Sequence, residues 1–154
     1  MNRIAVSAQD FPPPGWSGSL KRFAKKVLEE VKRDNWDLSF LLCADKTIKT
    51  LNTRYRNKAE VTDVLSFELG AEIRGKKGVR CLPGDIVISL DTLRENSLYF
   101  KISEDEELRR LLIHGILHLD GMDHRTNKKT EQMLQYQECI LAKLSGESII
   151  GGKI

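Results

Sequence analysis

The sequence predicts an α+β fold in which a small mixed sheet packs with helices. Short apolar segments with strand character alternate irregularly with segments of helical spacing, and no strict β-α-β rhythm connects them. One segment, residues 104–120, is apolar nearly all round, which indicates a central buried helix. The length of 154 residues suits one domain that can bury its own core.

The first half of the chain is expected to hold two strands and two helices. Residues 4–6 and 36–44 are apolar and strand-like, and the proline-rich segment that follows the first strand can only be a connection. Residues 20–33 have apolar side chains at helical spacing and a lysine-rich outer face. Asp45 can cap a second helix that ends near Arg56.

The second half begins with two more strands. Residues 64–67 and 84–89 have strand composition, and residues 70–83 between them, rich in Gly, Lys and Arg, are expected to form a mobile loop or a loose hairpin. Three helices follow. The first is capped by Asp91, the central one by Ser103 with a glutamate three residues later, and the last, residues 127–145, by Thr126.

Composition narrows the class of protein. The net charge is +3, and the local basic residues could contact phosphates, but on charge alone a solvated helix face is the favoured interpretation. No apolar stretch is long enough to span a membrane, and the N-terminus lacks a signal-peptide core, so a cytoplasmic location is expected. Three distant cysteines argue against a disulfide framework.

All three histidines of the chain lie in one segment, His114-Gly-Ile-Leu-His118-Leu-Asp-Gly121-Met-Asp-His124. His114 and His118 are four residues apart and share a helix face, so both imidazoles can bind one ion. Gly121 ends the helix, which lets His124 return to the same ion. The spacing predicts a metal site made of His114, His118 and His124.

Zinc is the expected ion, one per chain, because three neutral nitrogen ligands suit it, although other divalent metals can occupy such a site in vitro. No cysteine lies beside the motif to close a four-ligand site, and three protein ligands plus water is the catalytic pattern. Asp123 is expected to orient a ligand imidazole or the turn. Asp120 is expected to face solvent.

Apart from its second residue, the spacing is that of metzincin proteases. Those enzymes carry a glutamate there as general base, whereas this chain has Gly115, which favours close helix packing. The missing base favours phosphodiester over peptide chemistry, because a metal and an arginine can stabilise the charge of a phosphoryl transition state.

At this point the chain resembles the YbeY family of bacterial metal-dependent endoribonucleases. The resemblance is carried by residues 51–56 with 62–67, by residues 84–88 and by the histidine segment. Glu68 departs from the family pattern, which often has proline there. The resemblance implies a mixed four-stranded sheet, zinc on the three histidines, and Arg56 as the catalytic arginine. Without the family, Arg56 reads as a cation at a helix C-terminus.

The resemblance further implies a single-strand-specific endoribonuclease that acts in 16S rRNA 3′-end maturation and late ribosome quality control. Its partners would be single-stranded RNA, ribosomal RNA and the ribosome, with no membrane. Residues 1–154 are expected to form a single metal-dependent hydrolase domain, with residues 147–154 as a loosely ordered tail. Two alternatives stay open: a zinc-dependent peptidase or amidase, and a non-catalytic ribosome-assembly factor with structural zinc.

Overall fold

The frame of the molecule is a mixed four-stranded sheet with the strand order β1-β2-β4-β3. The computed structural model describes all residues except 59, 61, 125, 127, 129–130 and 152–154. The strands are β1 (Arg3–Ala8), β2 (Trp36–Cys43), β3 (Val64–Gly75) and β4 (Gly78–Ser89). β2 pairs in parallel with β1 and β4, whereas β3 runs antiparallel to β4.

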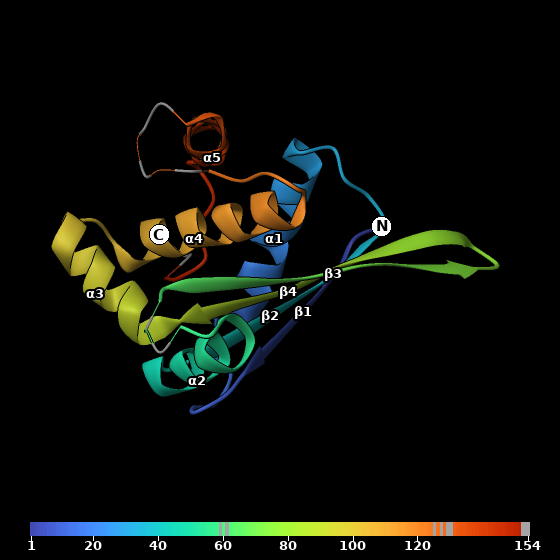
Figure 1. Cartoon of the computed structure of the whole chain (residues 1–154). Coiled ribbons are helices and arrows are strands. Elements are labelled where there is room, and N and C mark those ends of the chain that lie inside the picture. Colours follow the sequence, from blue (N-terminus) through green and yellow to red (C-terminus); the bar gives the residue numbers. More distant parts are fainter. Residues whose placement is uncertain (59, 61, 125, 127, 129–130, 152–154) are drawn as a thin grey trace.

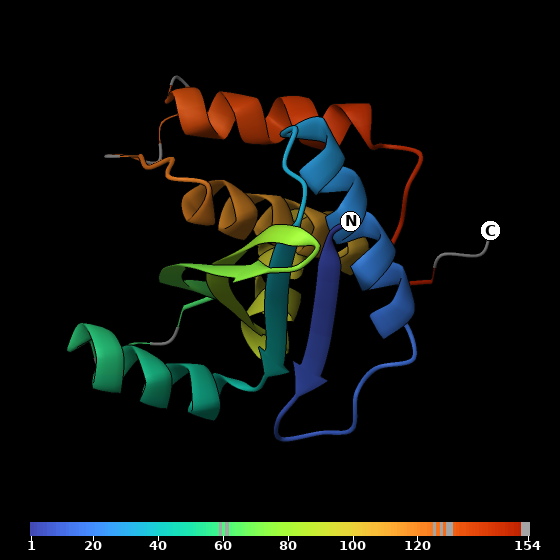
Figure 2. The ribbon, with the colours of Figure 1, turned by 90° about the vertical axis from the view of Figure 1, so that its right-hand side faces the viewer.

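Helices cover both faces of this sheet. They are α1 (Ser17–Glu30), α2 (Asp45–Arg56), α3 (Leu90–Phe100), α4 (Glu104–Leu119) and α5 (Gln132–Lys143). α1 and α4 lie on one face with α5 outside α4, and α2 lies on the other face (Figures 1 and 2). The predicted α+β class with a small mixed sheet is confirmed. No helix in the described part of the chain is long and apolar enough to cross a membrane.

α4 is the buried helix that the sequence predicted. Its apolar side chains Leu108, Leu112, Ile113, Ile116 and Leu117 are all fully buried, between the sheet below and α5 above. Each such side chain stabilises the fold by roughly 1.5–3 kcal/mol relative to exposure. The helix that carries two of the histidines is therefore held rigidly.

The N-terminal cap of α4 is also as predicted, since the Ser103 hydroxyl accepts a hydrogen bond from the Glu106 N–H at 3.0 Å. The caps predicted for the two preceding helices are wrong. α3 is capped by Ser89, whose hydroxyl accepts from the Thr92 N–H, and α2 has no side-chain cap. Asp45 instead accepts hydrogen bonds from the Ser89 and Thr92 hydroxyls, both at 2.6 Å, because tertiary partners compete with local capping.

β3 and β4 are longer than predicted. β3 continues past Phe67, and β4 begins before Gly84. Residues 70–83 therefore form most of an ordered hairpin that projects from the body (Figure 1). Backbone pairing along the ladder does not depend on apolar alternation, which is why the side-chain pattern missed it. At Gly84 the backbone has φ +144°, and a Cβ atom would lie 1.9 Å from the Phe67 carbonyl oxygen.

The end of the chain differs from the expected loose tail as far as it is described. Ile149 is fully buried, and the backbone N–H groups of Ile149 and Ile150 both donate to Asp105 Oδ1, at 2.6 and 2.7 Å. Residues 152–154 lie outside the described part. The last helix begins at Gln132 after an N-cap at Glu131, so the predicted start after Thr126 is wrong, and much of the predicted first turn falls on residues that are not described.

Candidate metal centre and active site

The three histidines predicted as metal ligands come together at the C-terminal end of α4. His114 and His118 lie one turn apart on the helix, and His124 returns from the segment after Gly121, whose φ of +93° lets the chain reverse. One nitrogen of each ring lies within 4.8 Å of the others. Among the described residues this is the only group of histidine, cysteine or carboxylate side chains close enough to hold a metal ion.

Hydrogen bonds fix which nitrogen of each ring faces the centre. His118 Nδ1 lies 3.1 Å from the Met122 carbonyl oxygen, and His124 Nδ1 lies 2.8 Å from the Thr126 carbonyl oxygen. A carbonyl oxygen can only accept, so each Nδ1 carries the proton and donates it. Nε2 is then left unprotonated, with its lone pair available to a cation.

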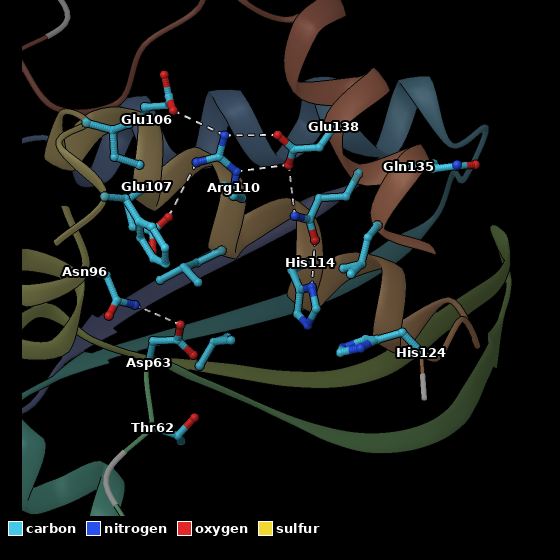
Figure 3. Close-up of a pocket in the computed structure, with 16 residues that line it drawn as sticks. Thr62, Asp63, Asn96, Glu106, Glu107, Arg110, His114, His124, Gln135 and Glu138 are labelled. Atoms are coloured by element: carbon cyan, nitrogen blue, oxygen red, sulfur yellow. Dashed lines mark hydrogen bonds and ion pairs between the residues drawn. The ribbon is translucent and has the colours of Figure 1, made fainter. Parts of the chain in front are cut away.

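His114 is oriented in the same way by a side chain of α5. Its Nδ1 lies 2.7 Å from Gln137 Oε1. The amide orientation of Gln137 is fixed because its Nε2 donates to Glu138 Oε2 at 3.1 Å. Glu138 is held in turn by Arg110, whose Nε and Nη2 both donate to its carboxylate at 3.0 Å (Figure 3). A chain of polar contacts therefore sets the His114 ring from outside the helix that carries it.

The resulting arrangement fits a cation better than it fits two bare imidazoles. The Nε2 atoms of His114 and His118 face each other at 3.1 Å, and neither has a proton to donate in this tautomer. Two nitrogens bound to one zinc at 2.0–2.1 Å with tetrahedral angles would be about 3.3 Å apart. The donor set, all neutral imidazole nitrogen, is one that zinc prefers.

Electrostatics keep the same two rings neutral. Burial lowers the pKa of His114 against the opposing effect of Gln137, and the neighbouring histidines lower it further. Burial also lowers the pKa of His118, with contributions from His124 and Arg56. A neutral imidazole is the form that binds metal, so the fold prepares the ligands before an ion arrives.

Gly115, between the two helical ligands, packs directly on the sheet. A Cβ atom there would lie 2.9 Å from Ile86 Cγ2 and 3.0 Å from Ile86 Cδ1. The predicted role of Gly115 in close helix packing is therefore what the structure shows. Because Ile86 is fully buried, any side chain at this position would overpack the sheet, and the glutamate that serves as general base in the metzincin arrangement is absent.

Arg56, predicted as catalytic, is the last residue of α2. This helix lies on the opposite face of the sheet from α4 (Figure 1). Its Nη2 donates to the Ser66 carbonyl oxygen at 3.0 Å. The Ser66 hydroxyl donates to the Gly115 carbonyl oxygen at 3.4 Å, which places Arg56 one strand away from the helical ligands. The charge of Arg56 makes the smallest of the contributions that shift the pKa of His118, and it lowers that pKa. One N–H holds the side chain, and the other donors of the exposed guanidinium have no hydrogen-bond partner among the described residues.

An open cleft of about 1170 Å³ leads away from the histidines between α3, α4 and α5 (Figure 3). His114 and His124 line one end of it, and Asn96, Glu107 and Arg110 lie further along. Burial raises the pKa of Glu107, against hydrogen bonds from Asn96 and Arg110. The lining of the cleft carries four carboxylates, those of Asp63, Glu106, Glu107 and Glu138, and one guanidinium, that of Arg110.

The predictions for Asp123 and Asp120, the two aspartates of the histidine segment, have different outcomes. The side chain of Asp123 accepts from the His124 N–H at 2.8 Å, so it shapes the turn that carries the third ligand. Asp120 was expected to face solvent, which is wrong. Its Oδ1 accepts from Arg33 Nε at 2.6 Å, and its side chain is only 15% exposed.

Gln137 was not predicted from the sequence, because nothing in its local pattern connects it to a histidine 23 residues away.

Comparison with known proteins identifies the family of the chain. Residues 8–145 match the family model described as Endoribonuclease YbeY. A protein of Treponema pallidum named Endoribonuclease YbeY is 46% identical over 144 residues, covering 93% of this chain and 90% of its own. One of Treponema denticola with the same name is 44% identical, covering 96% and 97%, and one of Aquifex aeolicus is 37% identical, covering 82% of each chain.

The fold is also known from a solved relative. The solution structure of TM1509 from Thermotoga maritima aligns with a TM-score of 0.61 at 29% sequence identity, covering 95% of this chain and 90% of that one. The family match, the shared fold and the converging histidines lead to one conclusion: the chain belongs to the endoribonuclease YbeY family.

Proposed function

We propose that the protein is a zinc-dependent endoribonuclease that cuts single-stranded RNA. The observation that carries the proposal is the convergence of His114, His118 and His124, each with its Nδ1 held by an oxygen so that Nε2 is free to bind an ion. Membership of a family named for endoribonucleases supports the enzyme class and the RNA substrate. His114, His118 and His124 would hold the ion.

Zinc is favoured over other divalent metals by the ligand set. Three neutral nitrogens and no carboxylate suit zinc and disfavour magnesium or calcium, which bind oxygen. When bound in such a site, zinc supplies a Lewis acid that polarises a phosphoryl oxygen and makes water acidic enough to react. The histidines, and not solvent, would set the coordination geometry of the bound ion, because two of the three rings belong to a buried helix.

Gly115 supports phosphodiester over peptide chemistry. Gly115 stands where a peptidase of this spacing has the glutamate that activates water, and its packing on Ile86 disfavours any side chain there. Transfer at phosphorus depends more on holding the phosphate and offsetting its charge than on a strong base. Arg56 would do this from the far side of β3, holding a non-bridging phosphate oxygen by its unused N–H groups as negative charge develops.

The cellular role that we propose follows what the family resemblance implies: 16S rRNA 3′-end maturation and late ribosome quality control. Single-stranded RNA, ribosomal RNA and the ribosome would then be the partners, and the cytoplasm the location. Contacts to the phosphate backbone would dominate the binding of RNA.

A cleavage assay on defined RNAs tests the proposal. The protein is stripped with chelator, reloaded with zinc and offered an unstructured RNA, the same RNA in a duplex, and an unstructured peptide. We expect cutting of the unpaired RNA alone, lost on chelation and restored by zinc. Rapid peptide cleavage would establish the peptidase alternative. Intact RNA, in a protein that unfolds when zinc is removed, would establish a structural role for the metal.

A further inference from the structure

The outer part of the β3–β4 hairpin carries exposed positive charge that has little compensation within the described part of the chain. We call residues 73–79 the distal hairpin. It carries the cations Arg74, Lys76 and Lys77 and no acidic residue, and all three cations are exposed. The only acidic partner among the described residues is Glu72, whose carboxylate lies 3.9 Å from Arg74, with both side chains more than half exposed. A pair of this kind contributes little to stability.

In the inner part of the hairpin, by contrast, the charged side chain of Arg80 binds other parts of the fold. Arg80 donates to Asp37 through Nε and Nη2, at 2.9 and 2.6 Å, and to the Met1 carbonyl oxygen. The side chain of Arg80 is only 19% exposed. The hairpin is thus anchored at Arg80, and the distal hairpin extends beyond this anchor as a two-stranded ribbon with a positively charged tip (Figure 1).

The side chains of the distal hairpin do not form an apolar docking face. Ile73 lies opposite Arg80 and Val79 lies opposite Arg74. Cross-strand partners share a face and successive residues alternate, so Ile73 and Val79 point to opposite sides of the ribbon. Ile73 and Val79 therefore do not form a continuous apolar patch, and the exposed cations Arg74, Lys76 and Lys77 suit a charged polymer better than the apolar anchor of a protein partner.

The hairpin starts beside the candidate metal centre. Ser66, which accepts from Arg56 and donates to the Gly115 carbonyl, is the third residue of β3. α4 runs over the sheet toward the hairpin, so its histidine-bearing end lies on the side from which the hairpin projects (Figure 1). The ten residue steps from Ser66 to Lys76 span at most roughly 33 Å at a strand rise of about 3.3 Å, because the ladder is irregular between Glu68 and Ala71. Stacked nucleotides rise about 3.4 Å each, so this reach equals about ten of them.

We propose that the distal hairpin is an RNA-binding arm, on which Arg74, Lys76 and Lys77 contact phosphates several nucleotides away from the bond that is cut. The inference rests on the proposed function, since it concerns the same RNA strand. Arg56 and the metal would hold the reacting phosphate, and the arm would hold the flanking strand without reading its bases. Long substrates would gain affinity from the arm, and substrates too short to reach it would not.

Charge neutralisation with a matched control tests the arm. The triple variant R74Q/K76Q/K77Q removes three positive charges beyond the Arg80 anchor. The control K21Q/R22Q/K25Q removes the same charge from exposed positions of α1 that form no ion pair among the described residues. Binding is measured as the Kd for a fluorescent unstructured RNA of about 20 nucleotides over a range of salt concentrations. Cleavage is measured on that RNA and on a tetranucleotide.

We expect the hairpin variant to bind the long RNA about tenfold more weakly at low salt. The slope of log K against log salt should fall by about 2, since each phosphate contact contributes about 0.7 for a single strand. Tetranucleotide cleavage should stay at the wild-type rate, and the α1 control should match wild type throughout. An unchanged slope in the hairpin variant would overturn the arm, and so would an equal loss on both substrates.

Failure of the arm and failure of the proposed function give different results. A wild-type protein that binds the long RNA with the expected salt dependence but cuts neither substrate leaves the arm standing and removes the nuclease activity. If the wild-type protein cuts RNA and the hairpin variant has the same Kd and the same salt slope, the RNA-binding arm is overturned and the nuclease activity stands. A protein that does not bind the RNA at all overturns both.

Discussion

His114 and Gln137 are joined by a 2.7 Å hydrogen bond across the interface between α4 and α5, and this bond selects the tautomer of the imidazole. The carboxamide can serve as acceptor only because its own N–H donates to Glu138. The metal centre is thus completed by a helix that contributes no ligand to it. Removal of this outer contact should loosen the ligand without unfolding the core.

The first prediction concerns Gln137. Substitution Gln137→Ala should weaken zinc binding by about 10–100-fold, the usual cost of losing a partner that orients a ligand histidine. The control is Gln135→Ala, on the same helix and in the same cleft but exposed and not bonded to a histidine. Competition against a chelating dye gives both affinities. Equal affinities for the two variants would show that Gln137 does not orient His114.

The second prediction separates Arg56 from the metal. Arg56→Ala should lower RNA cleavage by about 10²–10³-fold, the range seen when one donor to a developing negative charge is removed. Zinc affinity should be unchanged, because no ligand is lost. Arg56→Lys should recover only part of the rate, since an ammonium cannot donate two parallel hydrogen bonds. Arg54→Ala, in the same helical turn, is the control, and equal activity of Arg54→Ala and Arg56→Ala would remove Arg56 from the reaction.

The third prediction tests the contact between Gly115 and Ile86. Gly115→Ala should destabilise the fold by about 1–3 kcal/mol, although alanine is the better helix former, because the added methyl overpacks the sheet. Ile86→Val in the same chain should recover part of that loss. Urea denaturation of the two single variants and the double variant gives the coupling. A Gly115→Ala protein as stable as wild type would show that the sheet yields at this point.

The fourth prediction is a pH dependence of the metal-free protein. The pKa values of His114 and His118 are lowered in the fold, while the unfolded chain keeps the ordinary value near 6.5. The unfolded state therefore binds more protons below that pH, and the free energy of unfolding should fall as the pH drops from about 7 to about 5.5. His114→Gln should flatten this slope. Urea denaturation at several pH values measures it, and equal slopes for wild type and variant would contradict the assignment.

The parts of the site that could be predicted are those that a short stretch of sequence determines by itself. His114, His118 and His124 lie within eleven residues, and helical geometry plus one glycine brings them together. The buried helix and its Ser103 cap are local in the same sense. These predictions needed no knowledge of the rest of the chain.

The parts that could not be predicted depend on contacts between distant segments. Gln137 reaches His114 because α5 packs on α4, and Asp120 pairs with Arg33 across 87 residues. Asp45 has the right residue type for a cap, but its carboxylate binds the start of α3 instead. The outer hairpin lacks apolar alternation, so only backbone pairing reveals it. Local pattern predicts none of these partners, since each is chosen by tertiary packing.

The central claim is that three imidazole nitrogens share one zinc ion and leave a position for a reactant. X-ray absorption at the zinc edge of the purified protein tests it most directly. We predict one zinc per chain, with three nitrogen scatterers at about 2.0–2.1 Å and a fourth light atom from solvent. The imidazole signal should fall by a third in His124→Ala. A sulfur scatterer, fewer than three imidazoles, or no stoichiometric metal would contradict the account.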